Sequence, residues 1–137
     1  MVPYPFAPFV GWLVAGGIKF AINSIRSRAP AWEQIGYGGM PSTHTTIVTT
    51  TAALVGLREG WSTAPFGVAT ALGFIVIMDA MSLRRQIGTQ ARLINALMGD
   101  DPEHRAIRER IGHHWTEVVG GLIVGLGCAL ALDRLGR

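Results

Sequence analysis

Three short segments of the sequence carry side chains that could do chemistry. They read GGMPSTH at residues 38–44, DAMSLRR at 79–85 and GHHWTEV at 112–118. A histidine can act as nucleophile or proton donor near neutral pH, and Glu117, four residues after His113, could fix the tautomer of that ring. The structural alternatives are that His44 bonds to a helix start and that His113 and Glu117 form a plain ion pair. His114 competes with His113 for the same carboxylate.

Basic residues accompany these segments. Lys19 and Arg26 lie seven residues apart, which places them on nearly the same face of a helix. Arg84 and Arg85 end an apolar stretch. Each pair could simply reach toward lipid head groups or favour a helix C-terminus. Together they favour a phosphate, because guanidinium groups hold phosphate oxygens with paired hydrogen bonds.

A helix start next to His44 adds to this anion site. The backbone N–H groups of Ser42 and Thr43 would point out of the helix N-terminus, where anions bind. With two histidines present, one could attack phosphorus while the other protonates the leaving oxygen. The sequence contains no HExxH motif or cysteine pair, and the arginines would repel a cation. We therefore expect neither a metal nor a cofactor.

The composition is that of a membrane protein. Charged residues make up 15% of the 137-residue chain, against about 25% in a soluble domain. Four stretches lack Asp, Glu, Lys and Arg, and each approaches the ~20 residues that cross a bilayer as a helix. They are Val2–Ile18, Gly36–Leu57, Gly60–Met78 and Val118–Leu132. The sequence predicts an all-α polytopic bundle with about four transmembrane helices, as one domain over 1–137.

The expected helices follow these stretches. They cover about 5–25, 41–57, 64–83 and 112–132, with Pro41 at the first position of the second. Ile87, Ala91, Ile94 and Met98 recur at helical spacing, which predicts an amphipathic helix on the membrane surface. Trp32 and Tyr37 are expected as interface anchors. The pair Gly121–Gly125 is interpreted as helix packing.

Counting spans places the three segments at one membrane face. Most of the twelve Lys and Arg residues fall on that side, so the positive-inside rule predicts a cytoplasmic site in a bacterial cytoplasmic membrane. No basic stripe is interleaved with aromatic residues, so the expected partners are the bilayer and a lipid phosphate, with no nucleic acid. Few helix faces of so small a bundle can be buried internally, so a homo-oligomer or a larger membrane complex is a further expectation.

The three segments resemble blocks of the type-2 phosphatidic acid phosphatase and vanadium haloperoxidase superfamily. The match is to its small divergent membrane branch, the acid phosphatase/haloperoxidase-related family. That branch has blocks like Gly-Gly-Met-Pro-Ser-Ser-His, Asp-Ala-x-x-x-Arg-Arg and Gly-His-x-x-x-Glu-Val. Their order and rough spacing match this chain from Lys19 to the end of the last helix.

The resemblance implies catalytic roles for three residues. His113 is similar in position to the nucleophile that forms a phosphohistidine. Glu117 stands where the wider superfamily has an Asp that orients this histidine. His44 resembles the general acid for the leaving group.

The resemblance also implies a phosphate cradle. Lys19 and Arg26 fit the motif in which six residues separate Lys from Arg. Ser42 and one of Arg84 or Arg85 would complete the cradle, without metal.

The chain departs from the wider superfamily at several positions. Ser27 stands where a Pro follows the first arginine, and Thr43 where a Gly precedes the acid histidine. Ile107 stands where an arginine precedes the nucleophile by six residues, so that arginine would come from the pair at 84–85 or from Arg108. The superfamily also commonly has six spans, against the four expected here.

Two main functions follow as hypotheses. The first is a metal-independent phosphohydrolase that acts on a membrane lipid phosphate, such as a polyprenyl phosphate or diphosphate or a phosphatidic-acid-like lipid, through a phosphohistidine. The second is a non-catalytic member that binds a lipid head group or packs in a membrane assembly. Vanadate-dependent halogen oxidation is a third, which the resemblance alone suggests.

Overall fold

The structure is a computed structural model that describes residues 2–27, 39–99, 106–109 and 111–136. In these parts every regular element is a helix, which confirms the all-α prediction. The elements in chain order are the 3₁₀ turn η1 (Tyr4–Phe6), α1 (Ala7–Ser27), α2 (Thr43–Glu59), α3 (Ala64–Met78), the π-helical turn η3 (Asp79–Leu83), α4 (Arg84–Met98) and α5 (Trp115–Leu135).

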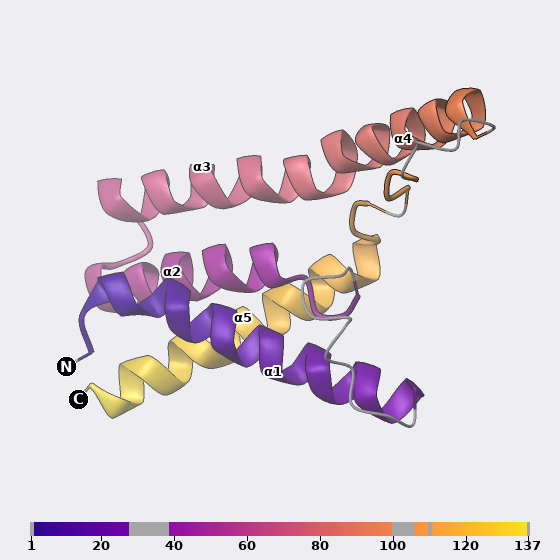
Figure 1. Ribbon diagram of the computed structural model, residues 1–137. Helices are drawn as coiled ribbons and strands as arrows, with labels where there is room; N and C mark the ends of the chain where they lie inside the picture. Colours follow the sequence, from indigo (N-terminus) through magenta and orange to yellow (C-terminus); the bar gives the residue numbers. More distant parts are fainter. Residues whose placement is uncertain (1, 28–38, 100–105, 110, 137) are drawn as a thin grey trace.

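Helix α2 is the centre of the bundle. It packs against α1, α3 and α5, and α1 also contacts α5. Figure 1 shows α3, η3 and α4 as one long rod that runs along α2 and then extends past the rest of the bundle. Both chain ends lie at the opposite end of the molecule (Figure 1).

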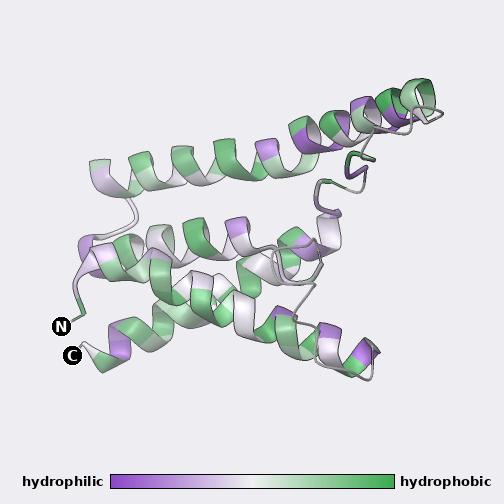
Figure 2. Ribbon diagram, viewed as in Figure 1, coloured by the Kyte–Doolittle hydropathy of each residue, from purple (hydrophilic) through white to green (hydrophobic). Residues whose placement is uncertain are grey.

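Three of the described helical segments are long and apolar enough to cross a membrane. They are Tyr4–Arg26, Ala64–Met98 and Trp115–Leu135. The remaining predicted span, α2, has 17 residues and lies among them. Figure 2 shows hydrophobic residues along α3 and hydrophilic ones where the rod passes into α4. The protein is thus a polytopic helical membrane bundle.

The rod that contains α3 and α4 is too long to be only a span. Its 35 residues extend about 50 Å at the α-helical rise, against a hydrocarbon core of about 30 Å. We expected a helix end near residue 83, and the structure instead places the widened turn η3 there. Helix α4 continues beyond it as the predicted amphipathic helix, with Ile87, Ile94 and Met98 exposed.

The threonine-rich face of α2 is buried without orphaned hydroxyl groups. Thr46 donates to the carbonyl oxygen of Ser42 at 2.9 Å, and Thr50 donates to that of Thr46 at 2.7 Å. These bonds to the preceding turn satisfy each hydroxyl within its own helix. Such short side chains also let neighbouring helices approach closely.

Helix α5 makes such a close approach to α2 at Gly121 and Gly125. A Cβ at Gly121 would lie 2.7 Å from the carbonyl oxygen of Ser42, and one at Gly125 would lie 2.6 Å from Cβ of Thr49. Only glycine allows the backbones of α5 and α2 to be this close. The interpretation of this pair as packing is therefore confirmed.

A buried ion pair closes the end of the bundle that holds the chain termini. Arg58 Nε of α2 lies 3.5 Å from Asp133 Oδ1 of α5, with both side chains at most 10% exposed. Arg58 also donates to the carbonyl oxygens of Val2 at 2.6 Å and Leu132 at 3.0 Å. One guanidinium therefore joins α2, α5 and the N-terminal segment.

Two predicted helix starts are wrong by a few residues. Helix α2 begins at Thr43, so Pro41 precedes it and Ser42 is the N-cap. Helix α5 begins at Trp115 with His114 as N-cap, so His113 lies outside the helix. The predicted anchors Trp32 and Tyr37 lie outside the described residues.

Candidate functional site

His113 and Glu117 form the tightest contact at the site. His113 Nδ1 lies 2.7 Å from Glu117 Oε2, and His113 is 8% exposed. The carboxylate can only accept, so Nδ1 carries the proton and the lone pair of the neutral ring is on Nε2. The same Oε2 accepts the backbone N–H of His114 at 3.2 Å, as expected of a glutamate in the first turn of a helix. Glu117 therefore caps α5 and selects the tautomer of His113.

The π-helical turn holds the backbone of His113. The backbone N–H of His113 donates to the carbonyl oxygen of Ala80, within η3, at 3.0 Å. Gly112, immediately before His113, has φ of +107° and lies against the backbone of Arg85. A side chain at Gly112 would be strained in this conformation. Ala80 acts here through its backbone carbonyl, so its side-chain type did not point to this role.

The segment before His113 is fastened to α4. The Asn95 side chain donates to the carbonyl oxygen of Ile107 at 2.7 Å and accepts the N–H of Ile107 at 2.8 Å. Gly88 makes room for this segment, since a Cβ there would lie 2.3 Å from the carbonyl oxygen of Glu109. Helix α4 thus supports the chain that leads to His113.

The start of α2 places His44 opposite His113. Ser42 donates its N–H to the carbonyl oxygen of Glu117 at 2.8 Å, which joins the first residues of α2 to those of α5. As a result the ring centroids of His44 and His113 lie 6.0 Å apart, at an angle of 60°. Residues that are about seventy apart in the sequence therefore converge, as the span count predicted.

Arg84 approaches His44 from the rod. Its Nη2 lies 3.3 Å from His44 Nε2, while its Nε donates to Asp79 Oδ2 at 3.1 Å. A guanidinium can only donate, so His44 Nε2 accepts and the proton of the neutral ring is on Nδ1. Among the described residues, the buried Nδ1 of His44 has no hydrogen-bond partner.

The environment of His44 disfavours its charged form. His44 belongs to α2, outside the three candidate spans. Burial, and then the positive charge of Arg84, lower the pKa of His44 from its ordinary value. Asp79 opposes this with a smaller effect. These surroundings therefore favour the neutral form of His44.

Lys19 reaches the site from α1. It is 8% exposed, and its Nζ donates to Thr43 Oγ1 at 3.1 Å. The resemblance aligned Thr43 with a glycine of the wider superfamily, and here the Thr43 hydroxyl accepts a hydrogen bond from the lysine. The lysine thus lies beside the first turn of α2, one residue from His44.

Ser42 joins the start of α2 to α5. Its side chain is fully buried, and its Oγ accepts both the N–H of Thr45 at 3.3 Å and the hydroxyl of Thr45 at 2.9 Å. Its own N–H is bonded to Glu117. Ser42 therefore caps α2 and fastens α2 to α5.

The other predicted basic residues are exposed. Arg26 is exposed near the end of α1, so the seven-residue spacing does not give it the buried position of Lys19. Arg85 is exposed on the rod and lines a separate groove. Arg108 is exposed in the segment before His113. Of the three candidates for the missing arginine, Arg84 is the one that contacts His44.

Metal ligands do not gather at this site in the part of the chain that the structure describes. No group of three His, Cys, Asp or Glu side chains is close enough there to hold an ion. The charged side chains near the two histidines are the cations Lys19 and Arg84 and the carboxylates Asp79 and Glu117. Of these, the two cations suit an anion.

Comparison with known proteins agrees with the blocks in the sequence. Residues 4–128 match the family described as "Divergent PAP2 family". The chain is 31% identical to "Uncharacterized membrane protein YuiD" of Bacillus subtilis (strain 168), over 84% of each chain. No solved structure matches. The family match covers most of the chain and includes all three blocks, so this protein belongs to the Divergent PAP2 family.

Proposed function

We propose that the protein is a metal-independent phosphohydrolase that acts on a membrane lipid phosphate through a phosphohistidine. The observation that carries the proposal is the 2.7 Å contact between His113 and Glu117, together with the ring of His44, whose centroid lies 6.0 Å from that of His113. Glu117 directs a proton to Nδ1 of His113, which leaves Nε2 to face a phosphoryl group, and His44 is placed to donate or accept a proton. Membership of a PAP2-related family supports the same chemistry.

The reaction would proceed in two displacements. His113 Nε2 attacks phosphorus, and an N–P bond forms as the bond from phosphorus to the leaving oxygen breaks. His44, after taking up a proton, donates it to that oxygen, and the lipid alcohol leaves. Water then attacks the phosphohistidine, its proton passes to His44, and inorganic phosphate departs as the N–P bond breaks.

Lys19 and Arg84 would hold the phosphoryl oxygens. Both are donors without an acceptor role, and they approach the histidines from different helices. Arg84 occupies the His44 nitrogen that must face the leaving oxygen, so substrate has to displace it. The phosphate then receives the guanidinium, and His44 is free to be protonated.

The substrate would enter from the bilayer. The site lies between helices that span it, and the outer face of α3 is apolar and exposed. A polyprenyl phosphate or diphosphate, or a phosphatidic-acid-like lipid, has both the phosphate and the apolar chain that this position requires.

Release of phosphate from a panel of lipid phosphates by the purified protein tests the proposal. We expect turnover by wild type, none by His113→Ala, and an acid-labile phosphoryl group trapped on wild type alone. If the folded wild type releases no phosphate from any substrate, the protein is instead a non-catalytic subunit that binds lipid head groups.

We also propose that the site faces the cytoplasm, on the basis of the charge distribution. Ala106→Cys introduces an exposed thiol on the same side, while the native Cys128 is buried. Labelling of this thiol from outside intact cells by an impermeant reagent would contradict the assignment.

A further inference from the structure

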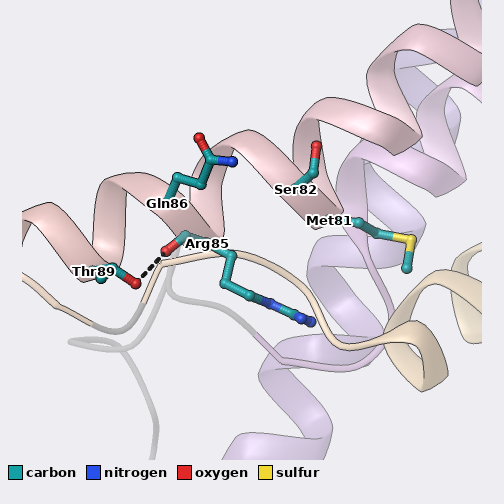
Figure 3. A pocket seen from close by; sticks show the side chains of 5 residues that line it. All are labelled: Met81, Ser82, Arg85, Gln86 and Thr89. Atoms are coloured by element: carbon teal, nitrogen blue, oxygen red, sulfur yellow. Dashed lines mark hydrogen bonds between the residues drawn. The ribbon is translucent and has the colours of Figure 1, made fainter.

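A second group of polar side chains lies on the rod formed by α3, η3 and α4, and the contacts at the two histidines do not involve it. Met81, Ser82, Arg85, Gln86 and Thr89 line a groove of about 440 Å³. Residues 82, 85, 86 and 89 have the spacing of one helix face. Figure 3 shows Arg85 and Met81 on one side of this face and Ser82 and Gln86 on the other.

Arg84 and Arg85 serve different surfaces. Consecutive residues of a helix point about 100° apart. Arg84 therefore reaches Asp79 and His44, whereas Arg85 turns toward the groove. Within the described parts of the chain, no hydrogen bond or ion pair engages the Arg85 guanidinium.

The groove offers two donors to a ligand. The hydroxyl of Ser82 donates to the carbonyl oxygen of Met78 at 2.8 Å, and that of Thr89 donates to the carbonyl oxygen of Arg85 at 3.2 Å. These hydroxyl protons are used within the helix. The guanidinium of Arg85 and the amide of Gln86 remain, and together they match an anionic oxygen pair.

From the length of a membrane-spanning helix, we expect the groove at the level of the lipid head groups. A helix of about 20 residues crosses the hydrocarbon core, so a span that begins at Ala64 leaves it near Leu83, just before Arg85. Trp61 is exposed at the other end of this span, where an aromatic anchor is expected. Between them, Leu72 is 57% and Ile75 64% exposed on α3, a surface for acyl chains.

We propose that this groove binds the phosphodiester head group of a bilayer glycerophospholipid, with Arg85 and Gln86 as its donors. A phosphodiester carries one negative charge, which a single guanidinium balances. The inference does not depend on the proposed phosphohydrolase activity, and it places Arg85 outside the cradle formed by Lys19 and Arg84.

Native mass spectrometry of the full-length protein, purified in detergent and incubated with phosphatidylglycerol, tests the proposal. We expect one retained lipid on wild type and about tenfold weaker retention on Arg85→Gln, as for the loss of one charged hydrogen-bonding group. Arg92→Gln is the matched control, because it removes the same charge from an exposed position further along α4. It should retain lipid like wild type, and Arg85→Lys should be intermediate.

Three further measurements decide between ligands and guard against misfolding. Diacylglycerol with the same acyl chains should not be retained, and millimolar inorganic phosphate should not displace the lipid. Gln86→Ala should weaken retention by a smaller factor than Arg85→Gln, with unchanged helical circular dichroism. The proposal is overturned if Arg85→Gln and Arg92→Gln behave alike, if diacylglycerol is retained equally, or if inorganic phosphate displaces the lipid.

Discussion

His113 Nδ1 lies 2.7 Å from Glu117 Oε2 although His113 is outside the helix that contains Glu117. The contact therefore depends on the turn at Gly112 and on the carbonyl of Ala80, which place the backbone of His113 before the first turn of α5. The carboxylate selects a tautomer in which Nε2 is free, and this is the property that a histidine nucleophile needs.

Glu117→Gln removes the charge that selects this tautomer. We expect turnover of a lipid phosphate to fall by roughly two or more orders of magnitude, the scale seen when the group that orients a catalytic histidine is lost. Phosphate release under saturating substrate measures the effect. His114→Ala is the matched control, since its ring contacts Thr116 and Trp115, and it should keep most activity. An active His113→Ala with an inactive His114→Ala would show that the nucleophile is the neighbouring residue.

The lowered pKa of His44 predicts an acidic optimum. A general acid works in its protonated form, and the fraction protonated falls as the pH rises through its pKa. Burial and Arg84 lower that pKa below the ordinary 6.5, so kcat/KM should decline with rising pH from below 6.5. His44→Ala, assayed with the same substrate, should lose this decline of kcat/KM with rising pH. Across a series of substrates, it should be slowest on those with poor leaving groups. If kcat/KM of His44→Ala declines with pH as it does in wild type, another residue is the general acid.

Arg84→Gln removes the cation closest to His44. We expect a loss of about a hundredfold in kcat/KM, the scale found when one donor to a developing charge is removed. Arg92→Gln, in the same rod but paired with Glu109 at 3.6 Å, should stay within a few-fold of wild type. Equal losses in the two variants would mean that general charge, and not the position of Arg84, supports turnover.

Activity should survive chelation. If Lys19 and Arg84 neutralise the transferring phosphoryl group, no divalent ion is required. Phosphate release in excess EDTA should match that in buffer alone, and vanadate should inhibit by imitating the five-coordinate transition state. Activity that disappears in EDTA and returns with magnesium or zinc would place the protein in another mechanistic class.

The pair formed by Arg58 and Asp133 should matter for stability and not for chemistry. Arg58→Ala removes the guanidinium that pairs with the buried Asp133 carboxylate and donates to the carbonyl oxygens of Val2 and Leu132. Removing one partner of a buried pair typically costs about 3–5 kcal/mol, so the thermal unfolding midpoint in detergent should fall clearly. The double change Arg58→Met with Asp133→Leu should recover much of it. A midpoint equal to wild type in Arg58→Ala would show that the pair is not stabilising.

The order of charge-free and polar stretches was enough to predict a helical membrane bundle, because a span needs an apolar run of known length. Counting these runs was enough to predict that His44 and His113 lie at the same end of the bundle. Their side-chain types pointed to anion chemistry, and the blocks around them to the family that the comparison then showed.

The tertiary structure decided what local pattern cannot encode. Lys19 and Arg26 share a spacing, yet only Lys19 is buried, because burial depends on which neighbouring helix covers a face. Arg84 and Arg85 are chemically identical neighbours, and the geometry of the rod directs one to His44 and the other to an outer groove. The support from Ala80 is a backbone contact between segments about thirty residues apart, and a backbone carbonyl leaves no trace in the sequence.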